Sequence, residues 1–219
     1  MLLAIDCAGP RVSVCAGTHQ DNLVSRGLNA KLNHNEILAA AVWEVLDLLD
    51  ESVPDRVAVN VGPGTFTGTR VGVSFAVGIA QGWGIPIIPV TSFELAIGMA
   101  PASADRVAVA LPIVRNLWCR VFMLRGDSGW EEGEIEELDR ASVSIGLNQT
   151  PLLAPLGDIS GAIMTPPDWC PSCELWKVAN DSNETTHLDP AMVRVRYVGP
   201  SQAERNFRDR RRAVEDSNR

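Results

Sequence analysis

Apolar side chains fall in short, regularly spaced runs over the first hundred residues, and the spacing in each run predicts a strand or a helix. The uninterrupted apolar run at 2–6 predicts a buried strand, and the alternation at 11–17 predicts a half-buried one. A third strand is expected near 22–28. From about 35 to 50, apolar positions recur at the spacing of an amphipathic helix. Three strands in succession therefore lead into a helix.

Strands and helices alternate further along the chain. Residues 57–61 predict a buried strand, and a glycine-rich turn leads from it into a helix expected at about 68–83. A strand is expected at 85–90, and another helix begins at the Thr91-Ser92 pair. The order βββαβα is that of an RNase-H-like lobe, the unit that actin-like ATPases duplicate. We therefore predict an α/β protein with the actin-like ATPase (RNase-H-like) fold and two lobes.

Beyond residue 100 the periodicity weakens. Residues 106–111 and 117–124 predict paired strands, whereas the acidic segment at 130–138 receives no assignment. We expect an N-terminal RNase-H-like lobe at 1–100. A smaller, divergent and eroded second lobe is expected at 101–219, with a C-terminal helix that could return to the first lobe.

Charge and cysteine content narrow the classes of function. A formal net charge of −8 works against broad nucleic-acid binding, because the field of the protein repels phosphates. Five cysteines without a secretory signal indicate reduced thiols, and therefore a cytoplasmic protein. No apolar stretch approaches the roughly 18 residues that a membrane span requires. We expect a soluble protein that reaches RNA, if at all, through a partner.

A glycine-rich turn at 62–72 connects a predicted buried strand to a predicted helix. Such a turn can receive an anion, because its backbone amides and the helix dipole point toward it. Together with Asp6 at the end of the first strand, Gly62, Gly64 and Thr65 form a candidate nucleotide site. The turn lacks the lysine and the spacing of a Walker A loop. A purely structural turn is an equal alternative, and for Asp6 a satisfied buried carboxylate is favoured.

The helix after this turn carries a stripe of small side chains. Gly68, Gly72, Ala76 and Ala80 recur every four residues and therefore share one face. A stripe of this kind allows close approach of another element. That element is either the protein's own sheet or a helix of another subunit, and the sequence favours neither.

The glycine-rich turn also carries a resemblance to a known family. Residues 62–72 match the signature Gly-Pro-Gly-Ser-Phe-Thr-Gly-x-Arg-x-Gly of the TsaB (YeaZ) family, with Thr65 in place of the serine. His34-Asn35-Glu36 stands where that family has His-Ser-Glu. Residues 197–204 resemble its Tyr-Leu-Arg-Pro-x-x-Ala-Glu, with Gly199 in place of the arginine. The resemblance is strong over about the first hundred residues and faint through the second lobe.

The resemblance implies a non-catalytic subunit in tRNA threonylcarbamoyladenosine synthesis. It implies pairing, through the two long helices of the first lobe, with a TsaD-like catalytic subunit. A TsaE-like ATPase is a further expected partner, a homodimer is possible, tRNA is contacted only indirectly, and ATP or ADP could bind at the partner interface. The expected partner-binding residues are Arg70, Gly72, Val73, Ala76, Ala80, His34, Ile37, Leu38 and Ala41.

Catalytic and metal-binding residues are not expected. In the related TsaD family a His-x-x-x-His pair follows the corresponding helix, but the stretch 90–96 contains no histidine. The three histidines of the chain are too scattered to suggest a metal site. The alternative is an independent ATPase or small-metabolite kinase of the same superfamily, in which Asp6 and the 62–70 loop would hold phosphates.

Two remaining features receive structural interpretations. Cys170 and Cys173 are spaced as in redox and zinc motifs, but ordinary thiols are favoured. A redox site of the thioredoxin type needs a strand-to-helix setting, which Trp169 and the surrounding prolines do not predict. The arginine-rich tail from residue 205 could contact tRNA phosphates, although a solvated helix is the favoured interpretation.

Overall fold

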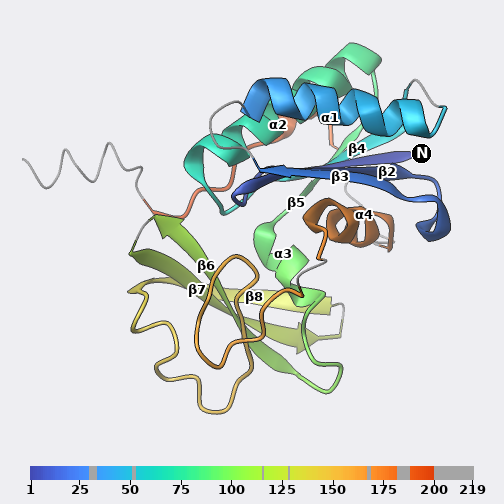
Figure 1. Cartoon of the computed structure of the whole chain (residues 1–219). Helices are drawn as coiled ribbons and strands as arrows, with labels where there is room; N and C mark the ends of the chain where they lie inside the picture. Colours follow the sequence, from blue (N-terminus) through green and yellow to red (C-terminus); the bar gives the residue numbers. More distant parts are fainter. Residues whose placement is uncertain are drawn as a thin grey trace, which may run out of the picture.

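The computed structural model describes residues 1–29, 34–50, 53–114, 116–127, 129–166, 169–181 and 188–199, with the side chains of residues 34 and 35 left out. The described chain forms two lobes, each built on its own β-sheet (Figure 1). The α/β fold predicted from the sequence is confirmed, and the first lobe has the predicted order βββαβα.

The first lobe is built on a five-stranded mixed sheet in the order β3-β2-β1-β4-β5. Its strands are β1 (Leu2–Asp6), β2 (Arg11–Gly17), β3 (Val24–Asn29), β4 (Arg56–Asn60) and β5 (Ile87–Val90). The first three pair antiparallel, while β4 runs parallel to both β1 and β5. Strand β1 is buried along its whole length because helices cover both faces of the sheet.

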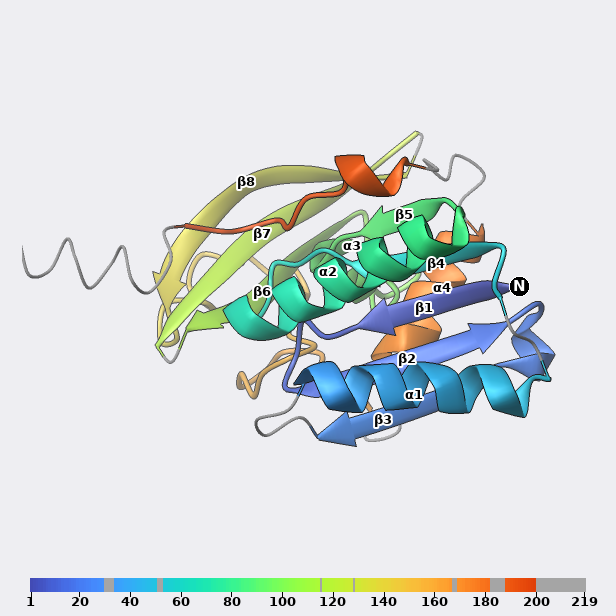
Figure 2. The same cartoon turned by 90° about the horizontal axis from the view of Figure 1, so that it is seen from above.

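Two long helices lie side by side on one face of this sheet (Figure 2). They are α1 (His34–Leu48) and α2 (Phe66–Trp83), and their inward side chains join the core formed with β1, β2 and β4. The sequence predicted the start of α2 two residues late. Gly68 belongs to the first helical turn instead of the loop, and Thr65 is the N-cap residue.

The connection to the second lobe is the short helix α3 (Ser92–Ile97). Thr91 and Glu94 form a capping box at its start, in which the Thr91 hydroxyl accepts from the Glu94 amide and the Glu94 carboxylate accepts from the Thr91 amide. Phe93 is fully buried on the second-lobe side. Helix α3 therefore ties the first sheet to the second one.

The second lobe contains a four-stranded sheet in the order β8-β7-β6-β9. Its strands are β6 (Arg106–Val114), β7 (Leu117–Gly126), β8 (Gly129–Asp139) and β9 (Leu152–Leu153). The acidic segment without an assignment from the sequence is the edge strand β8. Buried Arg120 of β7 pairs with Glu136 at 2.8 Å and donates to the carbonyls of Val143 and Ile145.

Two later segments return to the first lobe. Helix α4 (Pro171–Asp181) covers the face of the first sheet opposite α1 and α2 (Figure 1). The 3₁₀ turn η2 (Pro190–Met192) leads into the segment 193–198, which runs between the lobes; the other such turn, η1 (Gln20–Asn22), joins β2 to β3. Val193 is buried in the first core, and Val198 packs on the second. The expected 101–219 lobe is thus interleaved with the first. The C-terminal helix predicted beyond residue 205 lies outside the described residues.

Candidate functional site

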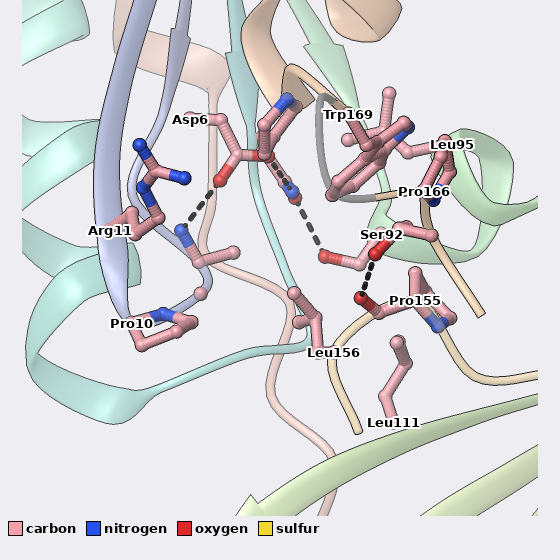
Figure 3. Close-up of a pocket in the computed structure, with 15 residues that line it drawn as sticks. Asp6, Pro10, Arg11, Ser92, Leu95, Leu111, Pro155, Leu156, Pro166 and Trp169 are labelled. Atoms are coloured by element: carbon pink, nitrogen blue, oxygen red, sulfur yellow. Dashed lines mark hydrogen bonds between the residues drawn. The ribbon is translucent and has the colours of Figure 1, made fainter. Parts of the chain in front are cut away.

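A hydrogen-bonded network joins the ends of the strands at the centre of the first lobe. Asp6 ends β1, and its carboxylate accepts from the Ala8 amide at 3.0 Å and from the Asn60 side-chain amide at 2.6 Å. The side-chain oxygen of Asn60, Oδ1, accepts in turn from the Gly62 amide at 2.9 Å and the Ser92 hydroxyl at 3.0 Å (Figure 3). The network therefore fixes β1, β4, the glycine-rich turn and α3 relative to one another.

The Asp6 carboxylate is only 4% exposed. Burial raises its pKa, while hydrogen bonds from Asn60 and Ala8 lower it in part. The net direction is upward, so Asp6 holds its negative charge less readily than an ordinary aspartate. A carboxylate with both oxygens engaged and a raised pKa is poorly suited to bind Mg²⁺ and phosphate.

A cavity of about 310 Å³ opens beside this network, between the two lobes. Asp6, Asn60 and Ser92 contribute its polar wall. Most of the remaining lining is apolar and comes from both lobes, including Pro10, Leu95, Leu111, Pro155, Leu156 and Trp169 (Figure 3). Among the described residues that line it, Arg11 is the only basic one. The cavity thus offers little charge complementarity to a polyphosphate.

The glycine-rich turn packs against the backbone just after β1. The Thr65 amide donates to the Ala8 carbonyl at 2.7 Å, and the Gly62 amide is engaged by Asn60. A β-carbon on Gly64 would lie 2.5 Å from the Ala8 carbonyl oxygen, which only glycine avoids. Of the four residues proposed for a nucleotide, the structure brings only Asp6 to the cavity. The amides of Gly62 and Thr65 are used within the chain.

The small-residue stripe of α2 faces the protein's own sheet. Ala76 and Ala80 are fully buried, and Gly72 and Val73 are buried beside them. A β-carbon on Gly72 would lie 3.0 Å from the Cys7 β-carbon, so small side chains let α2 approach β1 closely. The structure thereby decides between the two interpretations of the stripe: these residues belong to the core and cannot directly contact another chain.

The other residues expected at a partner interface are divided between core and surface. Leu38 and Ala41 of α1 are buried in the same core as the stripe. Ile37 is half-buried, and Arg70 is exposed. The His34 side chain lies outside the described part of the chain. Only Ile37 and Arg70 of the described candidates are thus available for contact.

The outer face of α2 is uncovered by any described residue (Figure 2) and carries little charge: its exposed positions combine Phe66 and two glycines with the polar residues Thr67, Arg70, Ser74 and Gln81. Among its 18 residues the only charged one is Arg70. Gly78 and Gly82 are exposed, and a β-carbon at either would meet no atom within 4 Å. The face also includes half-buried Val71 and Phe75. The solvent-facing side of a surface helix ordinarily carries several charged residues, so this face, with a single charge, is the strongest candidate for a docking surface.

Two aromatic contacts border this face. Trp43 of α1, which is 52% exposed, meets Trp83 of α2 edge-on at a ring separation of 6.0 Å. At the other end of α2, the Arg70 guanidinium lies 3.8 Å above the Phe66 ring and donates to the Tyr197 hydroxyl. Together with Ile37, Val71, Phe75, Gly78 and Gly82, these five residues form what we call the α1/α2 outer face. Trp43, Phe66 and Tyr197 were not among the partner-binding residues expected from the sequence, although Phe66 and Tyr197 lie in the two motifs that resemble the family.

The described residues contain no group of three or more histidine, cysteine, aspartate or glutamate side chains that could hold a metal ion. None of the described helices is long and apolar enough to cross a membrane. His187 and the arginine-rich tail lie outside the described residues.

Comparison with known proteins gives consistent relatives for part of the chain. A family model described as TsaD, tRNA N6-adenosine threonylcarbamoyltransferase, matches residues 28–114. The chain is 32% identical over 96 residues to the tRNA threonylcarbamoyladenosine biosynthesis protein TsaB of Bacillus subtilis, a match that covers 42% of each protein. It is 33% identical over 127 residues to the Haemophilus influenzae TsaB, covering 52% of this chain and 50% of the relative. The matches thus span about half the length, or less, of these curated relatives.

Solved structures extend the likeness to both lobes. A Pseudomonas aeruginosa protein described as similar to peptidase YEAZ superposes with a TM-score of 0.71 at 18% identity, covering 90% of this chain and 99% of the other. A structure of YeaZ from the same organism gives 0.70 over the same shares. At this level of identity the likeness establishes the fold.

Proposed function

We propose, from the premise that this chain is a member of the TsaB (YeaZ) family of the actin-like ATPase superfamily, that it is a non-catalytic subunit of tRNA threonylcarbamoyladenosine synthesis. In this proposal it pairs with a TsaD-like enzyme and holds it in an active arrangement. The enzyme then transfers threonylcarbamoyl to an adenosine beside the tRNA anticodon.

The observation that carries the proposal is the α1/α2 outer face. It presents Trp43, Phe75 and Tyr197 around exposed glycines, with Arg70 as the one charge on α2. Aromatic residues and arginine are the types enriched among binding hot spots. A paralogous lobe with a similar pair of helices would fit this face. In the absence of that partner, the same face would pair with its own copy, as a two-fold dimer requires.

The centre of the molecule supports a non-catalytic role. Asp6, the carboxylate that a superfamily ATPase would use, is tied into the internal network with Asn60 and Ala8. The Gly62 and Thr65 amides that would receive phosphate are engaged within the chain. These groups support the shape of the first lobe, and the chemistry is left to the partner. With a net charge of −8, the chain contacts tRNA through that partner instead of binding it directly.

Reconstitution tests the proposal. The TsaD-like protein of the same organism, a TsaE-like ATPase, a threonylcarbamoyl donor and tRNA are combined with increasing amounts of this chain, and modified adenosine is measured by nucleoside mass spectrometry. We expect product to rise until this chain and the TsaD-like subunit are equimolar, and then to level off. Full product without the chain would contradict the proposal. Product from the chain without the TsaD-like subunit would show that it is itself the enzyme.

A further inference from the structure

Helix α4 begins with a pair of cysteines in one turn. Cys170 directly precedes the first helical residue, Pro171, and Cys173 lies three positions after Cys170. From the sequence, the prolines around the pair did not predict a helix at this point. Proline is nevertheless well tolerated at the first helical position, because an amide there has no intrahelical acceptor to bond. The setting is thus a helix N-terminus, where redox-active cysteine pairs of this spacing are also found.

The two sulfur atoms lie together. The Cys173 amide donates to the Cys170 sulfur at 3.4 Å, and the two thiols are close enough that each shifts the pKa of the other. Residues three apart in a helix have Cα atoms about 5 Å apart. Disulfide-bonded cysteines have Cα atoms roughly 4.4–6.8 Å apart. A bond between Cys170 and Cys173 therefore requires no displacement of the helix.

Exposure separates this pair from the other cysteines. Cys170 and Cys173 are half-buried, whereas Cys7, Cys15 and Cys119 are buried. The surrounding helix is held firmly. The Ser13 and Ser172 hydroxyls bond at 2.8 Å, and the Trp176 indole donates to the Gly17 carbonyl at 3.2 Å. A small reagent can thus reach the pair while α4 stays docked on the sheet.

The pair also lies beside the cavity between the lobes. Trp169 and Pro171, the neighbours of Cys170 on either side, both line that cavity (Figure 3). Cys170 is close enough to Asp6 for its ionised form to raise the Asp6 pKa. The hydrogen bond with Cys173 raises the pKa of Cys170, and the one with Cys15 raises the pKa of Cys173. Both are therefore protonated thiols at neutral pH, and they react more slowly than an exposed cysteine.

We propose that Cys170 and Cys173 form a dithiol–disulfide pair that exchanges with small-molecule disulfides of the glutathione class. One cysteine thiolate attacks the small disulfide, forms a mixed disulfide and releases one thiolate. The second cysteine attacks the mixed disulfide, closes the Cys170–Cys173 bond and releases the other thiolate. The two cysteine protons pass to the released thiolates, so one small disulfide becomes two thiols. Excess thiol reverses the reaction. The inference concerns α4 alone and does not depend on the proposed pairing.

The test is to equilibrate the folded full-length chain with oxidised and reduced glutathione in varied ratio, alkylate the free thiols, and map disulfides by mass spectrometry. We expect one intramolecular bond, between Cys170 and Cys173, that reduced glutathione removes. Peptide mapping of the unaltered chain gives this result without reliance on any variant. Unmodified thiols throughout, a bond through Cys15, or glutathione adducts without an internal bond would each overturn the proposal.

Single variants sharpen the assignment. C170S and C173S should lose the internal bond completely, and each should carry a glutathione adduct on the remaining cysteine of the pair. C119A is the matched control, because Cys119 is buried in the second lobe, and it should behave as the unaltered chain does. An internal bond at full yield in C170S would contradict the assignment. Circular dichroism establishes that each variant is folded.

Discussion

The two faces of α2 together carry a single charge, Arg70, yet only the inner face has a partner among the described residues. The inner face, with Gly72, Ala76 and Ala80, is buried against the first sheet. The outer face, with Gly78 and Gly82, has open space where a β-carbon would lie. Small residues on the inner face are explained by the sheet below it. Small and apolar residues on the outer face have no such explanation among the described residues, which is the reason for assigning them to another chain.

The comparison also shows how a sequence pattern can point to the wrong side of a helix. The four-residue repeat of small side chains is the more regular feature, but it serves internal packing. The irregular outer face, with two glycines and scattered aromatic residues, is the one left for docking. Regular spacing indicates that a helix packs closely against something, and only the fold shows what that is.

The largest expected effect is on stability, from a charge on the inner face. In Ala76→Arg a long cation would enter a fully buried position, where it is both too large and unpaired. We expect a loss of more than about 4 kcal/mol in the free energy of unfolding, enough to unfold much of the chain. Urea unfolding followed by circular dichroism measures it. A variant as stable as the original would place Ala76 on the surface and contradict the described core.

The same substitution on the outer face should act on pairing instead. Gly78→Arg puts the side chain into open space and removes a helix-destabilising glycine, so stability should rise by about 0.5–1 kcal/mol. Affinity for the TsaD-like subunit should fall at least about 100-fold, as for the loss of a hot spot. Calorimetric titration measures it. Gly78→Ala is the matched control and should pair normally; unchanged affinity in Gly78→Arg would exclude this face.

Asp6 anchors the hydrogen-bonded network that connects β1 to the glycine-rich turn, from which α2 begins. Asp6→Ala leaves the amides of Ala8 and Asn60 without their acceptor, at an expected cost of about 1–3 kcal/mol. Because burial raises the pKa of Asp6 in the folded state, its contribution is greatest at low pH and is lost as the pH rises through that raised pKa. The stability difference between the two proteins should therefore be larger near pH 4 than near pH 8. A difference that grows with pH would contradict the raised pKa.

Aromatic truncation at the edge of the outer face should have a smaller effect. Trp43→Ala removes an exposed ring and its edge contact with Trp83. We expect a roughly tenfold loss of affinity for the TsaD-like subunit and a loss of about 1 kcal/mol in stability. Met164→Ala, an exposed apolar truncation in the second lobe, is the control and should leave pairing unchanged. Equal effects of the two variants would show that pairing does not select this face.

The smallest effect is expected at the end of α2. Tyr197→Phe keeps the ring beside Phe66 but removes the hydroxyl that accepts from Arg70. Because the pair is exposed, we expect a change of only about 0.5 kcal/mol in stability and about a twofold change in affinity. Competition binding against the unaltered chain resolves a difference of this size. A loss as large as that of Gly78→Arg would move the centre of the interface to Tyr197.

The sequence predicts the first lobe well because its strands and helices carry distinct periodicities. The strand predicted at 2–6 and the helix predicted to begin at the Thr91-Ser92 pair both correspond to observed elements. The acidic strand β8 could not be predicted in this way. Its charged side chains give no apolar alternation, and the strand forms because β7 supplies a partner for its backbone and Arg120 holds Glu136.

Contacts between residues that are far apart in the sequence could not be predicted, for a different reason. The Arg70–Tyr197 bond joins residues 127 positions apart, and no local pattern specifies such a pair. Helix α4 returns to the first sheet through contacts such as Trp176 with Gly17, which are set by the fold as a whole. The candidate nucleotide residues illustrate the same limit. The sequence identified Asp6 and the glycine-rich turn, but only the structure shows that their polar groups bond mainly to each other and to the backbone.

The most direct test of the docking surface is the solution mass of this chain mixed with the TsaD-like protein of the same organism, by light scattering on a sizing column. The original chain and Gly78→Ala should each elute with the partner as a single one-to-one complex, and Gly78→Arg should leave two separate peaks. Two separate peaks for the original chain, or a complex that forms equally well with Gly78→Arg, would contradict the assignment of the α1/α2 outer face to that partner.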